Sequence, residues 1–194
     1  MNYWKEFLPF YFYSAIAGSL TIKASWYKSY SLSKILLLAG VGMISWMFVE
    51  YGLHRFFFHY EAKSPTAKQL VYRMHLSHHE NPKALDSLFS SLYTSVPFAS
   101  FYCLLTWLVT GSWQMMSYLF LGLITGYFAY ELLHYQAHHY TSKLAPLRYL
   151  KKYHMLHHYQ SPKCRFGVTT PFIDWLFGTY KAVASKNAEK TLTV

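Results

Sequence analysis

A long stretch without a charged side chain constrains this chain more than any other feature of its sequence. No Asp, Glu, Lys or Arg occurs from residue 88 to residue 130. One membrane helix needs about 20 apolar residues, so this stretch is too long for a single span. The sequence Thr110-Gly111-Ser112 near its middle is typical of a tight turn. We therefore predict a membrane hairpin of two helices, at residues 92–109 and 113–133.

Two more uncharged or nearly uncharged runs precede this hairpin. Residues 35–53 contain one charged side chain, Glu50, near their end, and are long enough to span a bilayer. Residues 7–22 form a shorter run that contains Pro9, so a membrane span and an interfacial position both remain open for it. The sequence thus predicts an all-α integral membrane protein with three to four transmembrane helices. No linker or compositional break divides the chain, and we expect one domain, residues 1–194.

Basic side chains predict the orientation of the helices. The chain has 18 Lys+Arg and 8 Asp+Glu, a net charge of +10. Most cations lie between the predicted spans 35–53 and 92–109 or after the predicted span 113–133. Lys23, Lys28 and Lys34 fall at the opposite face of the membrane. The positive-inside rule places the richer face in the cytoplasm. There, residues 64–86 and 144–159 are expected to form amphipathic helices on the membrane surface. No nucleic-acid partner is expected, because the cations alternate with long apolar runs.

The histidines supply the chemical signal. All 11 fall into four clusters: His54 with His59; His75, His78 and His79; His134, His138 and His139; His154, His157 and His158. A helix places residues i, i+3 and i+4 on one face. The second and fourth clusters therefore each present three imidazoles on one face, and His134 shares a face with His138.

Two histidines fit this pattern less well. His59 follows His54 by five residues, so the two rings converge only if the helix distorts or ends between them. His139 points roughly 140° away from His134 on a regular helix, which makes it the weakest ligand candidate. The other ten are too many for one ion and fit two ions with about five ligands each.

The clusters are expected to meet at one membrane face, because His54 and His134 each close a predicted span. Soluble di-iron bundles use Glu and Glu-x-x-His ligands, but Asp and Glu together number only 8 here. Metal-bound imidazoles need partners that orient them. The candidates for this role are Glu50, Asp86, His139 and Asp174.

These motifs resemble those of the fatty acid hydroxylase superfamily, which includes fatty acid 2-hydroxylases, sterol oxidases and desaturases and, more distantly, carotenoid hydroxylases. The resemblance covers residues 45–180 and is carried by EYGLHRFFFH at 50–59, HLSHHENPKALD at 75–86, YELLHYQAHH at 130–139 and the segment 153–180. The first and third motifs are most similar to those of fatty acid 2-hydroxylases.

The resemblance implies an enzyme, an O2-dependent oxidoreductase with two Fe ions, for which Zn is the expected substitute in a purified sample. It implies these metal ligands: His54, His59, His75, His78, His79, His134, His138, His154, His157 and His158. Tyr130 matches a tyrosine beside the metals. The substrate would be a lipid from the bilayer, hydroxylated on its acyl chain. Because no cytochrome b5 domain is fused to the chain, the electrons would come from a separate cytochrome b5, ferredoxin or reductase.

Alternative functions remain open from the sequence. A sterol or carotenoid hydroxylase or desaturase would use the same metal centre, and the HLSHHENP motif is also similar to carotenoid hydroxylases. A metal transporter or store is a more distant alternative. Transport requires ionisable residues at the middle of the bilayer, whereas the histidines here are expected at the ends of the predicted spans. The lack of a fused electron-transfer domain favours a bacterial inner membrane over the endoplasmic reticulum.

Overall fold

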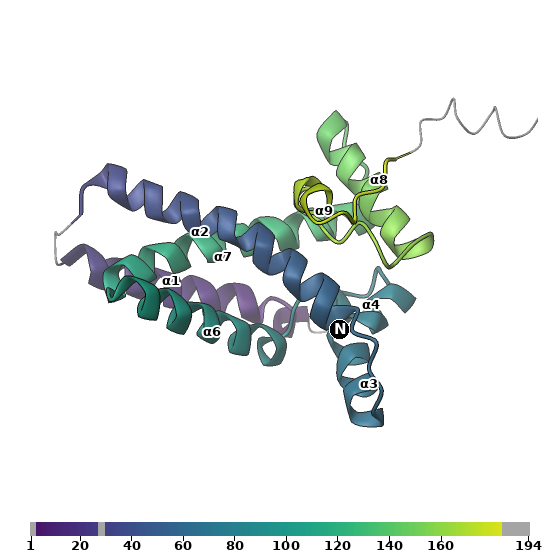
Figure 1. Cartoon of the computed structure of the whole chain (residues 1–194), viewed down its shortest axis with the longest axis horizontal. Helices are drawn as coiled ribbons and strands as arrows, with labels where there is room; N and C mark the ends of the chain where they lie inside the picture. The colour runs from purple at the N-terminus through teal and green to yellow at the C-terminus, as the bar shows by residue number, and fades with distance from the viewer. Residues whose placement is uncertain (1–2, 27–29, 184–194) are drawn as a thin grey trace, which may run out of the picture.

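The computed structural model describes residues 3–26 and 30–183, and all regular secondary structure within them is helical. Four long helices lie side by side, each running opposite to the one before it in the chain: α1 (Leu8–Trp26), α2 (Leu32–Gly52), α6 (Leu92–Thr110) and α7 (Trp113–His139). The remaining elements form a cap at one end of this bundle (Figure 1). The prediction of an all-α protein is therefore confirmed.

Three helical segments of the described chain are long and apolar enough to cross a membrane: Leu32–Phe58, Leu85–Thr110 and Trp113–His139. They contain the predicted spans 35–53, 92–109 and 113–133, and the last runs six residues beyond its predicted end. Helix α1 packs against α7 within the bundle but does not meet the same criteria of length and hydropathy. Three spans lie within the predicted range of three to four.

The turn of the α6–α7 hairpin follows from its residues. Gly111 ends α6 with a φ of 61°, a left-handed conformation that glycine adopts without a steric penalty. Ser112 then caps α7, because its hydroxyl accepts a hydrogen bond from the backbone N–H of Met115. The turn lies at the end of the bundle remote from the cap (Figure 1).

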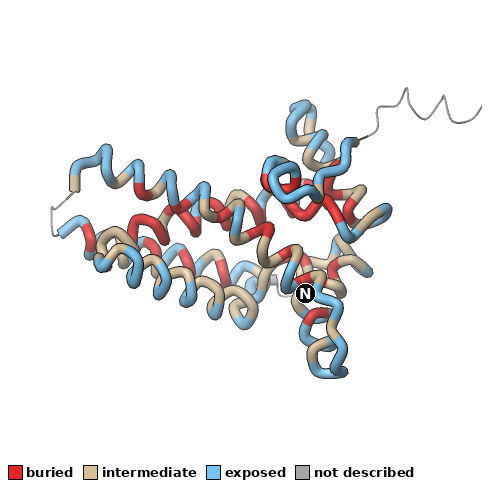
Figure 2. Tube along the Cα trace, viewed as in Figure 1, coloured by how far each residue is buried: buried red, intermediate tan, exposed pale blue. Residues whose placement is uncertain are grey.

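Helices α2 and α7 approach each other closely. A Cβ atom at Gly42 would overlap the carbonyl oxygen of Leu119, and one at Gly122 would overlap that of Ala39. One turn further along α7, Gly126 receives the side chain of Trp46. Gly122 and Gly126 form a G-x-x-x-G pair, the pattern by which small residues allow membrane helices to pack backbone against backbone. Figure 2 shows the buried residues concentrated along this contact and inside the cap.

The cap contains short elements and one longer helix. A π-helical segment, η2 (Leu53–Phe58), continues α2 directly. After it come α3 (Pro65–Val71), a second π-helical segment η3 (Tyr72–Leu76), α4 (Ser77–Glu80) and α5 (Leu85–Leu88). Helices α8 (Ala145–Tyr159) and α9 (Phe172–Leu176) complete it.

The helical structure predicted over residues 64–86 is therefore present except for a break between α4 and α5. Asn81 leaves the helical conformation, with a φ of −132° and a ψ of 73°, and the chain has no regular structure before α5. Asn-Pro at 81–82 explains the break, because a residue before proline is driven out of the α region. The helix predicted over 144–159 agrees with α8. Helix α9 was not predicted.

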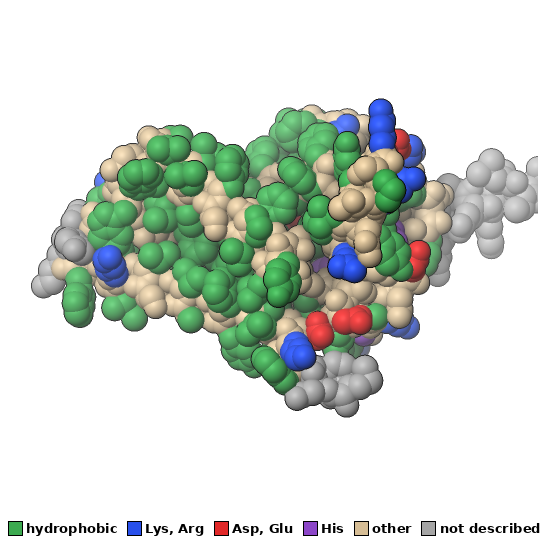
Figure 3. Space-filling view, turned by 90° about the horizontal axis from the view of Figure 1, so that it is seen from below, with side chains coloured by type: hydrophobic (Ala, Val, Ile, Leu, Met, Phe, Trp, Pro, Cys, Tyr) green, Lys and Arg blue, Asp and Glu red, His purple; other side chains and the backbone are tan. Residues whose placement is uncertain are grey.

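Charged side chains gather at the cap end of the molecule, whereas hydrophobic side chains cover most of the bundle (Figure 3). Lys23 near the end of α1 and Lys34 near the start of α2 lie at the remote end. Lys28, which was predicted with them, lies outside the described residues. The uneven distribution of cations inferred from the sequence is thus present in the structure.

Candidate metal centre

The π-helical segment η2 explains how His54 and His59, which are five residues apart, can lie close together. The backbone N–H of His59 donates to the carbonyl of His54, a pairing of residue i with i+5. A wider turn of this kind brings residues five apart close together, and π-turns inside helices are common at functional sites. The ring centroids of His54 and His59 lie 5.0 Å apart. The predicted distortion of the helix between these two histidines is confirmed.

The two H-x-x-H-H clusters do not act as units. His75 on η3 and His79 on α4 turn toward His54, whereas His78 turns toward His134 and His138. The fourth cluster divides in the same way, because His157 approaches His59 while His154 and His158 approach His138. The prediction that each cluster presents three rings on one face was too simple, since each cluster contributes to two groups.

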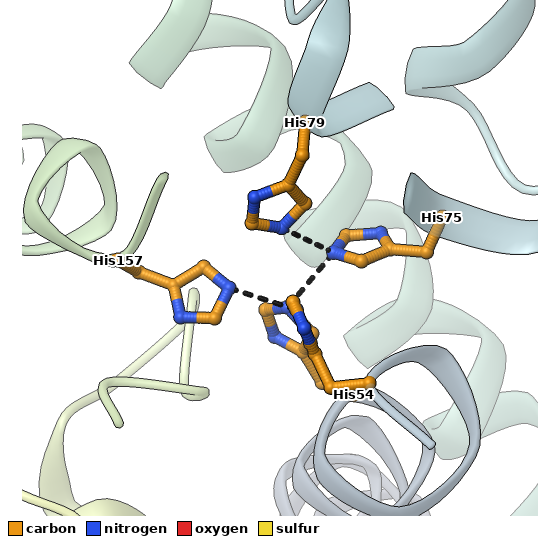
Figure 4. A group of neighbouring side chains, drawn as sticks. His54, His75, His79 and His157 are labelled. Carbon is orange, nitrogen blue, oxygen red and sulfur yellow. Dashed lines mark hydrogen bonds between the residues drawn. The ribbon is translucent and has the colours of Figure 1, made fainter. Parts of the chain in front are cut away.

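The ten predicted histidines thus form two groups of five. Within each group one ligand atom from each ring lies within 4.8 Å of all the others. The first histidine group consists of His54, His59, His75, His79 and His157. The second histidine group consists of His78, His134, His138, His154 and His158. Figure 4 shows four rings of the first group, from four different elements, with their nitrogens turned toward one another.

Distances within the groups fit metal coordination. His75 Nε2 lies 3.0 Å from both His54 Nε2 and His79 Nε2, and in the second group His138 Nε2 lies 2.9 Å from His154 Nε2. Two nitrogens each about 2.1 Å from one ion, at right angles, would be about 3.0 Å apart. Five converging imidazoles have no anion or carbonyl between them to accept their protons, but their lone pairs suit a cation. The residues present therefore fit a metal ion in each group.

Backbone carbonyls orient two rings of the first histidine group. His54 Nδ1 donates to the carbonyl of Phe166, and His157 Nδ1 donates to the carbonyl of Cys164 at 2.8 Å. A carbonyl oxygen can only accept, so both rings carry their proton on Nδ1. Their Nε2 lone pairs then face the group, the tautomer that a metal ligand requires.

The loop that supplies these carbonyls, residues 164–169, is held by two buried carboxylates and is named the closing loop. Glu50 accepts from the backbone N–H groups of Val168 and Thr169 and from the Thr169 hydroxyl. Asp174 accepts at 2.8 Å from the N–H groups of Phe166 and Gly167. Glu50 and Asp174 have no described hydrogen bond to a histidine. They act on the rings through the closing loop, a route that the sequence did not reveal.

The other two candidate partners lie away from the ligands. Asp86 is exposed on α5, and no described hydrogen bond joins it to a histidine. His139 belongs to neither group; its ring stacks on Tyr135, with the centroids 4.4 Å apart. This position agrees with the helical angle that made His139 the weakest ligand candidate. Tyr130, by contrast, stacks on His134 of the second group, with the centroids 5.5 Å apart.

Burial keeps the imidazoles of the cap neutral. It lowers the pKa of His78 to about 2 and that of His79 to about 4, and neighbouring histidines lower the pKa of His78 further. The pKa of His154 falls well below its ordinary value for the same two reasons. A neutral ring offers a lone pair where a protonated ring cannot, so these nitrogens are available to a metal ion at physiological pH.

Glu131 is a buried acid that the sequence reasoning missed. It has no exposed surface, and its side chain accepts a hydrogen bond from the backbone N–H of Ser90 at 3.0 Å. This bond ties α7, one turn before His134, to the chain that enters α6. The available signal was its position inside an apolar span, where ionisable residues are rare and usually functional.

A cavity of about 850 Å³ opens beside the first histidine group and has His59 in its wall. The wall comes from η2 and the residues after it, from α3 and η3, and from residues 162–166. It is mainly apolar and aromatic, with Phe56, Val71 and Phe166 among its residues. Its volume falls within the range of about 300–1,000 Å³ typical of small-molecule sites.

Comparison with known proteins agrees with this geometry. A family model described as fatty acid hydroxylase matches residues 39–179. The chain is 32% identical over 184 residues to the dihydroceramide fatty acyl 2-hydroxylase FAH2 of Arabidopsis thaliana, covering 93% of this chain and 76% of that protein. It is 39% identical over 146 residues to the ceramide very long chain fatty acid hydroxylase SCS7 of Saccharomyces cerevisiae, covering 72% of this chain and 37% of that protein.

Another relative, the fatty acid 2-hydroxylase of Rattus norvegicus, is 30% identical, and the match covers 87% of this chain and 47% of the rat protein. The chain therefore spans less than half of the yeast and rat proteins. A solved structure described as full-length scs7p, with only its hydroxylase domain visible, superposes with a TM-score of 0.77 at 30% identity. That superposition covers 93% of this chain and 67% of the solved chain.

Proposed function

Because this chain belongs to the fatty acid hydroxylase family, we propose that it hydroxylates the acyl chain of a membrane lipid at a pair of histidine-bound iron ions. One observation supports this more than any other: ten histidines, nine on η2, η3, α4, α7 and α8 and one directly after η2, converge as two groups of five at the end of an apolar bundle. The ten histidines are the proposed ligands, and residues 1–194 are proposed to form one membrane-embedded domain.

The chemistry has a simple balance. A C–H bond, O2, two electrons and two protons give a C–OH bond and water. The bound ions would supply the activation of O2, for which the protein has no side chain of its own. The relatives include fatty acid 2-hydroxylases and dihydroceramide fatty acyl 2-hydroxylases. We propose the same carbon, next to the acyl carbonyl, for this chain.

The protein would position the acyl chain beside the metal ligands and exclude water from it. The cavity beside His59 would hold the reacting part of the acyl chain against the first histidine group, and its apolar wall would exclude water. The closing loop would keep His54 and His157 in the ligand tautomer during turnover. Tyr130 would support His134 from the membrane side.

We further propose that the cap faces the cytoplasm, since the cap end is rich in cations and the remote end is poor in them. A separate cytochrome b5, ferredoxin or reductase would supply the two electrons there. The curated relatives described above come from plants, yeast and mammals. They give no support to the predicted bacterial inner membrane, so the proposal covers an integral membrane location and the orientation of the cap but names no particular membrane.

Lipid mass spectrometry tests the proposal. Cells that produce the chain are expected to accumulate acyl chains heavier by one oxygen atom, with the hydroxyl at carbon 2. Metal analysis of the purified protein is expected to give about two ions per chain, iron after anaerobic loading or zinc as a substitute.

His157→Ala is expected to abolish the product while the protein remains in the membrane. His139→Ala is the matched control, because this histidine lies outside both groups. Acyl chains lighter by two hydrogens, or oxygen found only on sterols or carotenoids, would replace hydroxylation of acyl chains by the alternative reactions of the superfamily. Full activity in His157→Ala would refute the proposed ligand set.

A further inference from the structure

We infer that the cavity beside the first histidine group receives an acyl lipid whose head group carries a net negative charge, an anionic phospholipid. This inference rests on the proposed function, because it names the class of lipid that the cavity takes. The cavity combines an apolar wall with cations from three elements, Arg55 on η2, Lys68 on α3 and Lys163 just before the closing loop. An apolar wall suits an acyl chain, and the cations suit an anion beside it.

The side chain of Arg55 is held in place in the wall of the cavity. Its Nη1 donates to the Tyr51 hydroxyl at 2.6 Å, and that hydroxyl lies 2.9 Å from the Thr179 hydroxyl. The guanidinium is therefore fixed from one side by neutral groups. A guanidinium has five N–H donors, and it recognises phosphate and carboxylate oxygens in pairs. No acidic side chain pairs with Arg55 within the described residues.

Lys163 and Lys68 differ in a way that gives the cavity its net charge. Lys163 is paired with Glu61 at 2.7 Å, and this is the one ion pair in the described part of the chain. Lys68 lies in the same wall and has no such partner there. The pair of Lys163 with Glu61 is neutral overall, so Arg55 and Lys68 leave two uncompensated positive charges on the wall.

The position of these cations favours a head group over the carboxylate of a free fatty acid. Hydroxylation at carbon 2 requires carbon 1 to lie beside the metal ligands. Lys68 is exposed, and neither it nor Arg55 belongs to a histidine group. A charge held by the exposed Lys68 is therefore expected beyond carbon 1, where a phospholipid carries its phosphate.

Binding and turnover test the inference separately. Native mass spectrometry of the purified protein would measure retention of phosphatidylglycerol and phosphatidylcholine with identical acyl chains. Turnover would be measured for the same two lipids, for a ceramide and for free palmitic acid. The variants are Arg55→Gln with Lys68→Gln, and Lys23→Gln as a control cation at the remote end of the bundle.

Phosphatidylglycerol is expected to be retained about tenfold better than phosphatidylcholine, the effect of about one charge-assisted hydrogen bond. The double variant is expected to lose this preference, and Lys23→Gln to keep it. Equal retention of both lipids by the unmodified protein, a preference that survives in the double variant, or selective use of ceramide or palmitic acid would overturn the inference. Hydroxylation without a charge preference would leave the proposed function intact. Retention of phosphatidylglycerol with no hydroxylated product from any lipid would refute the proposed function alone.

Discussion

The two histidine groups contain the same number of rings but are held in different ways. In the first group, the closing loop fixes His54 and His157 through backbone carbonyls. In the second group, the Nδ1 atoms of His78, His134, His154 and His158 are buried without a hydrogen-bond partner among the described residues. Packing of rings on α7 and α8 holds that group instead, with Tyr130 stacked on His134.

This difference indicates that the first group depends on a folded loop and the second on the bundle. The first group also borders the cavity through His59, and two of its rings, His59 and His79, are only partly buried. We therefore expect changes in the loop, the bundle and the individual ligands to affect the two ions to different degrees.

The largest expected contrast comes from single ligands. His157→Ala removes one ligand from the first group and His154→Ala one from the second, so each is expected to lose one ion of the pair. Activity is expected to fall by more than about 100-fold in both, beyond the range of losses typical when only a partner of a ligand is removed. Metal analysis of the purified variants checks this, and loss of both ions from each variant would show that the groups bind metal only together.

A change at the contact of α2 with α7 is expected to affect both groups equally. Gly42→Val would force α2 away from Leu119, and since α2 leads to His54 while α7 carries His134, both groups would lose their geometry. We expect destabilisation of about 3 kcal/mol or more, as found for severe overpacking. Thermal unfolding in detergent measures it.

Gly40→Val is the matched control for that change, because a Cβ atom at Gly40 meets nothing within 4 Å. Equal loss of stability in the two variants would mean that valine itself, and not the close contact, is responsible.

A smaller and selective effect is expected from the closing loop. Asp174→Asn keeps the shape of the side chain but replaces an acceptor of two backbone N–H groups by an amide. The affinity of one ion is expected to fall by about 10- to 100-fold, the usual cost of losing a partner of a metal ligand. Chelator titration of the loaded protein measures the two ions separately.

Asp86→Asn, on the exposed face of α5, should leave both affinities unchanged. The comparison of the two groups would fail if Asp174→Asn weakened both ions alike.

The smallest expected effect concerns Tyr130. Tyr130→Ala removes the ring that stacks on His134 and is expected to weaken the ion of the second group by about 0.5–1.5 kcal/mol, the contribution of an aromatic pair. Tyr130→Phe keeps the ring and should keep the affinity. The same chelator titration tests both variants, and a large loss of affinity in Tyr130→Phe would show that the hydroxyl is the important group.

Much of the architecture was predictable from the sequence. The Thr110-Gly111-Ser112 turn within a charge-free run determines where helix α6 ends and helix α7 begins, because apolar surface and turn residues act locally. The convergence of the histidines was predictable for a similar reason, since helical spacing and the ends of the spans bring the clusters to one face.

The details that depend on distant contacts were not predictable. The division of His75, His78 and His79 between two groups depends on where α7 and α8 lie in the cap. The closing loop reaches Glu50 from more than 100 positions along the chain, and no local pattern marks a carbonyl oxygen as the partner of an imidazole. The close approach at Gly42 had a readable signal in the G-x-x-x-G pair of α7, but its partner helix did not follow from the pattern.

The order of the ligands along the chain has a consequence for how the protein is made. The first group takes His157 from α8, and the second takes His154 and His158 from the same helix. While the ribosome is still synthesising α8, neither group has its full set of nitrogens, although α2, α6 and α7 can already be in the bilayer. The proposed ions would therefore be acquired only after α8 has emerged, and a nascent chain arrested before α8 would be inserted but unable to hold a complete metal centre.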